Sequence, residues 1–150
     1  MDAVNTFQVF DWLWTSGQIS EEDIRQIQHE GFTTVINLAL PTSSNALKGE
    51  AEMVANLQMN YFNIPVEWEL PEVGQFELCT NLLNVLHEHG DKVWLHCAMN
   101  MRVSAFVYLY RKLVLKQAEE EALHPMKEVW TPNPLWREFM DEVIGQNDNS

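Results

Sequence analysis

Short runs rich in β-branched and aromatic residues alternate along this sequence with segments of helical periodicity. Three of these runs are predicted to be buried strands, because they are apolar and bounded by Gly, Pro or charged residues: Phe32–Leu38, Tyr61–Val66 and Val93–Leu95. Strands separated by helices need crossover connections, which are right-handed and place helices over the sheet. The sequence therefore predicts an α/β fold with a central, mostly parallel sheet flanked by helices on both faces.

The helical segments carry end signals and apolar faces. Ser20 and Asp23 have the spacing of a capping box at the start of the first helix. Further helices are predicted at Glu50–Met59, at Glu72–His89, after Cys97, and from Asn133-Pro134 to a stop before Gly145. Cys79 shares the apolar face of its helix, so this cysteine is predicted to be buried.

Length and composition favour one folded domain. The chain has 150 residues and is 46% hydrophobic, so it can bury a core large enough to offset the conformational entropy of folding. We expect a single domain over residues 1–150, with a frayed tail at about 146–150. The N-terminal residues lack a basic and apolar leader, and no apolar run approaches the roughly 20 residues that cross a bilayer. These features predict a cytoplasmic protein.

A formal net charge of −13 limits the partners. This charge repels nucleic-acid phosphates and anionic lipid, so neither nucleic acid nor a membrane is an expected partner. Cys79 and Cys97 belong to no CxxC or Cys/His pattern, so we expect no disulfide framework, no metal and no cofactor. A small substrate, or a protein with a basic patch, fits the charge better.

One segment carries recognisable chemistry, and it surrounds Cys97. A cysteine between a buried strand and the first turn of a helix meets free backbone N–H groups and the positive end of the helix dipole, which both stabilise a thiolate. The same N–H groups can cradle an anion such as phosphate, and a guanidinium at the helix start can hold two of its oxygens. An isolated cysteine would more simply be an inert apolar residue, but its neighbours favour an anion site. The predicted phosphate-binding residues are Ala98, Met99, Asn100, Met101 and Arg102.

The sequence resembles the cysteine-dependent protein phosphatases, specifically the bacterial proteins similar to dual-specificity phosphatases. The resemblance covers most of the chain and rests on four motifs: Thr15-Ser16-Gly17-Gln18, Gly31–Leu38, Tyr61–Val66 and the His96-Cys97…Arg102…Ser104 loop. It implies a phosphatase in which Cys97 attacks phosphorus, Arg102 and the loop amides stabilise the phosphoryl group, and water hydrolyses a phosphocysteine. The implied substrate is a phosphorylated small molecule or a phosphoprotein. His96 is interpreted as a hydrogen-bonded core residue that fixes the loop.

The spacing of this loop departs from the family pattern. The family has five residues between Cys and Arg, a Gly in the middle and a Ser or Thr after the Arg, whereas four residues separate Cys97 from Arg102. Aligned without a gap, Asn100 takes the Gly position, Val103 the Arg position, and Ser104 the hydroxyl position that supports the thiolate. One residue along a helix turns a side chain by about 100°, so Arg102 reaches the anion only if the loop is tighter or the helix starts earlier.

The general acid of the family is an Asp on the loop after the third strand. In this sequence the matching position is Trp68, and the candidate acids are its neighbours Glu67 and Glu69. The simpler interpretation of both glutamates is solvated loop charge.

Two other functions remain open at this point. The loop length resembles that of rhodanese-like sulfurtransferases, which would carry a persulfide on Cys97. The absent Asp and the displaced Arg would also fit a non-catalytic anion-binding or interaction protein.

Overall fold

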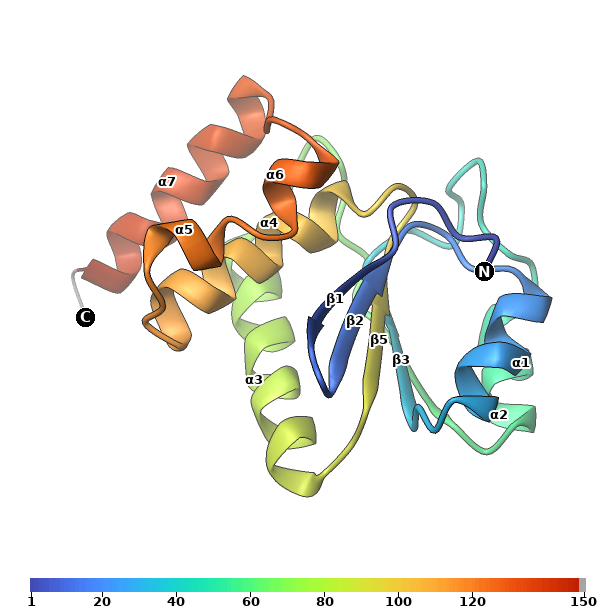
Figure 1. Ribbon diagram of the computed structural model, residues 1–150. Coiled ribbons are helices and arrows are strands. Elements are labelled where there is room, and N and C mark those ends of the chain that lie inside the picture. The colour runs from blue at the N-terminus through green and yellow to red at the C-terminus, as the bar shows by residue number, and fades with distance from the viewer. Residues whose placement is uncertain (149–150) are drawn as a thin grey trace.

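Five strands of four residues each form one sheet in the computed structural model, which describes residues 1–148 (Figure 1). The strands are β1 (Phe7–Phe10), β2 (Leu13–Ser16), β3 (Thr34–Asn37), β4 (Asn60–Asn63) and β5 (Val93–His96). Their order across the sheet is β1-β2-β5-β3-β4, and only β1 runs antiparallel to its neighbour. The predicted mostly parallel sheet is confirmed. The hairpin of β1 and β2 was not predicted, and it adds two strands at one edge.

Helices cover both faces of this sheet (Figure 1). They are α1 (Glu21–His29), α2 (Glu50–Asn56), α3 (Val73–His89), α4 (Met101–Leu109), the π-helix η1 (Tyr110–Val114), α5 (Glu119–Ala122), α6 (Met126–Val129) and α7 (Pro134–Asp148). Within the described residues, none of them is long and apolar enough to span a bilayer.

Successive residues of the central strand β5 face the two layers alternately. Val93 and Leu95 belong to the apolar cluster that contains residues of α3, α4 and α7. Trp94 belongs to the opposite cluster, which contains residues of α1 and α2, and its ring lies 5.2 Å from that of Phe32. This period of two is what a strand buried on both sides requires. His96 therefore lies on the same side of the strand as Trp94.

The predicted helix starts are confirmed to within one residue, but two predicted ends are wrong: the helix predicted over Glu50–Met59 ends at Asn56, and the final helix passes its predicted stop. The Ser20 hydroxyl accepts a hydrogen bond from the Asp23 N–H at 3.0 Å, and the Asp23 carboxylate accepts one from the Ser20 N–H at 3.0 Å. The final helix α7 continues through Gly145 to residue 148, so residues 146–148 of the predicted tail are helical, while 149–150 lie outside the described residues. A glycine costs a helix only about 1 kcal/mol, and burial of the preceding Val143 holds this turn in place.

The four parallel strands all end on a polar residue. The register aligns Ser16 of β2, His96 of β5, Asn37 of β3 and Asn63 of β4 in one row. The carboxyl edge of a parallel sheet is where α/β proteins place their ligands. This row therefore marks the edge at which a site is expected.

Candidate active site

The Cys97 thiol lies at the carboxyl end of β5, where the chain turns into α4. It is 1% exposed and faces a cavity of about 200 Å³. The cavity is lined by Trp68, Cys97, Ala98, Met99, Met101 and Arg102. Most of the predicted loop residues thus surround one space.

The carbonyl groups of the loop accept hydrogen bonds from three separate segments. The Ala98 carbonyl accepts from the Gln18 N–H at 3.0 Å and from Asn45 Nδ2 at 3.2 Å. The Met99 carbonyl accepts from Asn5 Nδ2 at 2.9 Å. These bonds hold the loop carbonyls in place from outside the loop.

The backbone N–H groups of the loop have no such partners. Among the described residues, no acceptor is bonded to the N–H groups of the five residues from Ala98 to Arg102. Successive unpaired N–H groups at the start of a helix form a concave anion site, and the dipole of α4 favours negative charge there. The loop is therefore built to receive an anion next to the thiol.

Gly17 lets the segment after β2 pass close to this loop. A Cβ atom on Gly17 would lie 2.8 Å from the Ala98 carbonyl oxygen and 2.8 Å from a methyl group of Val4. The Cys97 N–H points to the Ser16 carbonyl oxygen at 3.4 Å. The Thr15–Gln18 motif therefore supports the loop from the hairpin side.

Asn100 makes the turn that a glycine makes in the family pattern. Its backbone adopts the left-handed conformation, with φ 67° and ψ 4°, as its alignment with the glycine predicted. Its Nδ2 donates to the Asn5 carbonyl at 2.7 Å and to Thr15 Oγ1 at 3.1 Å. Asparagine tolerates this conformation better than most residues, and here its side chain also ties the loop to the hairpin.

Arg102 lines the cavity because α4 begins at Met101, one residue before it. Its Nη1 donates to the Val66 carbonyl at 2.8 Å. Its Nε and Nη2 bond no acceptor among the described residues, which leaves one edge of the guanidinium group free for a bidentate contact with an anion. Val103 is fully buried in the core. Of Arg102 and Val103, the two candidates for the Arg position of the family loop, the structure therefore brings Arg102 to the cavity.

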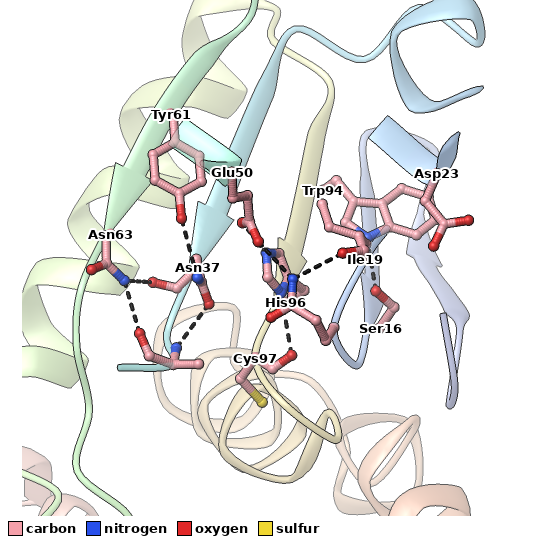
Figure 2. A network of polar contacts seen from close by, with 12 residues as sticks. Ser16, Ile19, Asp23, Asn37, Glu50, Tyr61, Asn63, Trp94, His96 and Cys97 are labelled. Atoms are coloured by element: carbon pink, nitrogen blue, oxygen red, sulfur yellow. Dashed lines mark hydrogen bonds and ion pairs between the residues drawn. The ribbon is translucent and has the colours of Figure 1, made fainter. Parts of the chain in front are cut away.

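His96 is buried behind the loop and pairs with a carboxylate. Its Nε2 lies 2.6 Å from Glu50 Oε2, and its Nδ1 lies 3.2 Å from the Cys97 carbonyl oxygen (Figure 2). Both ring nitrogens of His96 therefore have an oxygen partner within hydrogen-bond distance. Gln18 also donates to Glu50, at 2.6 Å. The interpretation of His96 as a hydrogen-bonded core residue is confirmed.

Besides Asn100 and His96, three further predicted residues do not line the cavity. Glu67 and Glu69 are exposed and line no part of it, whereas Trp68 between them does. The Ser104 hydroxyl donates to the Met101 carbonyl at 3.1 Å, so in this structure it does not support the thiolate. Among the described side chains, no group of three His, Cys, Asp or Glu is placed to hold a metal ion.

Sequence reasoning missed the residues that hold the loop from other segments: Asn5, Gln18, Asn45 and Glu50. Glu50 did leave a signal. It precedes Val54 by four residues, and both are buried on the inner face of α2. A carboxylate on an apolar helix face requires a partner, and a buried His at a strand end is a natural one.

Residues 5–138 match the sequence model of the family described as DSP-PTPase phosphatase fused to NAD+ kinase. The chain belongs to this DSP-PTPase phosphatase family. This match confirms the resemblance to dual-specificity phosphatases that the Cys97 loop indicated. Among curated proteins, none matches the sequence.

Solved structures of phosphatases share the fold. A protein assigned as a DUF442 phosphatase from Shewanella putrefaciens CN-32 is 28% identical, with 97% of this chain and 95% of that chain covered and a TM-score of 0.81. PTPMT1 in complex with PI(5)P is 13% identical, with 96% and 97% covered and a TM-score of 0.80. P. aeruginosa TpbA in complex with pTyr is 14% identical, with 95% and 82% covered and a TM-score of 0.67. The last two show the fold alone.

The two thiols of this phosphatase are expected to differ in reactivity. Burial in the core raises the pKa of Cys79 to about 12, so that thiol stays protonated at neutral pH. Cys97 instead meets the unpaired N–H groups of the loop, which stabilise a thiolate. Iodoacetamide labelling of the folded protein at about pH 7 should therefore modify Cys97 at least about 100-fold faster than Cys79. Equal rates, read by mass spectrometry, would contradict the reactive-thiolate interpretation.

Removing Glu50 is expected to destabilise the fold strongly. Burial alone would raise the pKa of Glu50, but the hydrogen bond and charge of His96, with the bond from Gln18, bring it below its ordinary value of 4.5. Glu50→Ala leaves the buried imidazole without its partner, which costs about 3–5 kcal/mol of unfolding free energy. Because the pKa of Glu50 is lower in the folded state, its contribution is complete above about pH 4.5 and is lost as the pH falls through the lowered pKa.

Urea unfolding at several pH values measures this effect. Glu52→Ala is the matched control, since Glu52 is exposed in the same first turn of α2 and should shift the unfolding free energy by less than about 0.5 kcal/mol. Glu50→Gln keeps a hydrogen-bond acceptor and should lie between the two. Equal stability of Glu50→Ala and Glu52→Ala would mean that the Glu50–His96 pair contributes nothing.

Proposed function

We propose that this phosphatase hydrolyses phosphomonoesters through a phosphocysteine intermediate at Cys97. The thiolate attacks phosphorus, the S–P bond forms, and the P–O bond to the leaving group breaks. Water then attacks phosphorus, the S–P bond breaks, and inorganic phosphate leaves. Arg102 and the loop N–H groups hold the oxygens of the transferring group in both steps.

One observation carries this proposal. The Cys97 thiol, five unpaired N–H groups and the free edge of the Arg102 guanidinium converge at a single loop and its cavity. Phosphoryl transfer relies chiefly on such positioned donors around the equatorial oxygens. A structural cysteine would need none of them.

The size of the cavity bears on the substrate. A volume of about 200 Å³ admits a phosphoryl group and the first atoms attached to it, so most of a larger substrate would stay outside. PI(5)P is bound by PTPMT1 and pTyr by TpbA, and both are phosphomonoesters. For this chain the proposed substrate is likewise a phosphorylated small molecule or a phosphoprotein.

A second candidate is a sulfurtransferase that carries a persulfide on Cys97. One observation favours it: only four residues separate Cys97 from Arg102, a spacing that resembles the rhodanese-like loop. Persulfide chemistry needs the nucleophile and the loop amides but no general acid.

Rapid quenching of the enzyme with labelled 4-nitrophenyl phosphate tests the proposal. We expect burst release of 4-nitrophenol and a transient phosphoryl group on the peptide that contains Cys97. Transfer of sulfur from thiosulfate to cyanide without phosphate release would support the second candidate. Binding of inorganic phosphate without turnover of either substrate would indicate an anion-binding protein and overturn both enzymatic assignments.

A further inference from the structure

None of the described residues that line the cavity next to Cys97 is an acid. Of these lining residues, two carry an ionisable side chain, Cys97 and Arg102. The first is the proposed nucleophile, and a guanidinium is too weak an acid to protonate a leaving group. The two carboxylates that flank Trp68 in the sequence, Glu67 and Glu69, are exposed and do not line the cavity.

Trp68 fills the place between these two glutamates, and its surroundings hold it there. Its ring lies 5.3 Å from that of Trp130 and 5.7 Å from that of Trp136. Its carbonyl accepts a hydrogen bond from Trp136 Nε1 at 2.8 Å. On the cavity side, the Arg102 guanidinium carbon lies 6.0 Å from the Trp68 ring centroid. A tryptophan held at so many points is a fixed aromatic wall.

A missing acid affects leaving groups unequally. A positioned general acid contributes about 10²–10⁴-fold when the leaving oxygen needs a proton. A phenol has a pKa of about 10, so its anion leaves with little help, whereas an alkoxide is far more basic. A positioned acid therefore matters most for alkyl phosphates, and a cavity wall with tryptophan in place of the acid favours aryl phosphates.

We infer that the site takes phosphate esters of phenols, with the Trp68 ring stacked on the leaving group in place of a proton donor. This inference rests on the proposed function. Stacked aromatic pairs contribute about 0.5–1.5 kcal/mol beyond their burial, which favours an aryl over an alkyl group in the same position. Met99 and Met101, which also line the cavity, supply further apolar contact.

The step balances without an acid. The Sγ–P bond forms as the P–O bond breaks, and the electron pair leaves on the phenolate oxygen. The phenolate takes its proton from bulk water after it departs. Water then hydrolyses the phosphocysteine, and the products are a phenol and inorganic phosphate.

The wild-type enzyme tests the inference with a series of substituted phenyl phosphates and an alkyl phosphate. We expect kcat/KM to fall at least about tenfold from 4-nitrophenyl phosphate to phenyl phosphate, and an alkyl phosphate to turn over at least about 100-fold more slowly still. A flat series, or efficient alkyl phosphate hydrolysis, would overturn the inference. Failure of 4-nitrophenyl phosphate to react at all would overturn the proposed function instead.

Variants at Trp68 and its neighbours sharpen the result. Trp68→Asp places a carboxyl group in the cavity wall and should raise alkyl phosphate hydrolysis at least about tenfold, with a new pH dependence. Trp68→Asn introduces a side chain of the same shape as Asp but without an acidic proton, so it should not raise this activity. Trp68→Phe keeps an aromatic face and should preserve the KM for phenyl phosphate better than Trp68→Asn does. Glu67→Gln and Glu69→Gln should leave the whole series unchanged, and a loss of alkyl phosphate hydrolysis in either would identify the acid and overturn the inference.

Discussion

Replacing Cys97 with serine is expected to lower kcat/KM for 4-nitrophenyl phosphate by about 10⁴-fold or more, the scale on which loss of a nucleophile acts. A serine hydroxyl is far less acidic than a thiol, and none of the described residues that line the cavity can take its proton. Binding of inorganic phosphate should stay within about threefold, because the loop N–H groups and Arg102 remain. Steady-state kinetics and calorimetric titration with phosphate measure the two effects separately.

Cys79→Ala is the matched control for this experiment. Cys79 is equally buried, but it lies on α3 in the apolar core and does not line the cavity. Its loss should cost about 1–2 kcal/mol of unfolding free energy and leave kcat/KM unchanged below the melting temperature. A folded Cys79→Ala protein as inactive as Cys97→Ser would contradict the assignment of the nucleophile.

The local parts of this structure could be predicted from the sequence because short-range patterns encode them. Ser20 and Asp23 fix a helix start through bonds between residues three apart, and the helix that starts at Asn133-Pro134 follows the same logic. The position of Cys97 follows from a buried strand that is followed, after a short loop, by a largely apolar helix. Asn100 could be identified as the turn residue because few side chains tolerate a positive φ.

The remaining parts depend on pairings between distant segments. No Gly-containing turn joins β1 and β2 at Asp11-Trp12, so the hairpin left no clear signal in the sequence. The bonds of Asn5, Asn45 and Glu50 to the loop region span between 46 and 94 positions in the sequence. One sequence gives the residue types for such contacts but not their partners.

Arg102→Ala is expected to lower kcat/KM for an aryl phosphate by about 10³-fold and to weaken phosphate binding in parallel, because the Arg102 fork is the cation in the cavity wall. Arg102→Lys keeps the charge but loses the bidentate geometry and the contact of the guanidinium with the Trp68 ring, so it should recover only part of the rate. Steady-state kinetics, with phosphate inhibition as the binding measure, test both variants. A small effect of Arg102→Ala would mean that this guanidinium only bonds the Val66 carbonyl.

Val103 is the control that decides between the two alignments of the loop. Its side chain is fully buried in the core, so Val103→Ala should cost about 1–3 kcal/mol of stability and leave kcat/KM within about threefold. Val103→Arg would force a charge into that apolar cluster, and we expect an unstable protein with no gain in activity. If Val103→Arg instead folded and hydrolysed aryl phosphates faster than the parent, the family spacing of five residues would describe the active loop. Arg102 would then be a structural residue, since one phosphoryl group in a cavity of about 200 Å³ leaves room for one such fork.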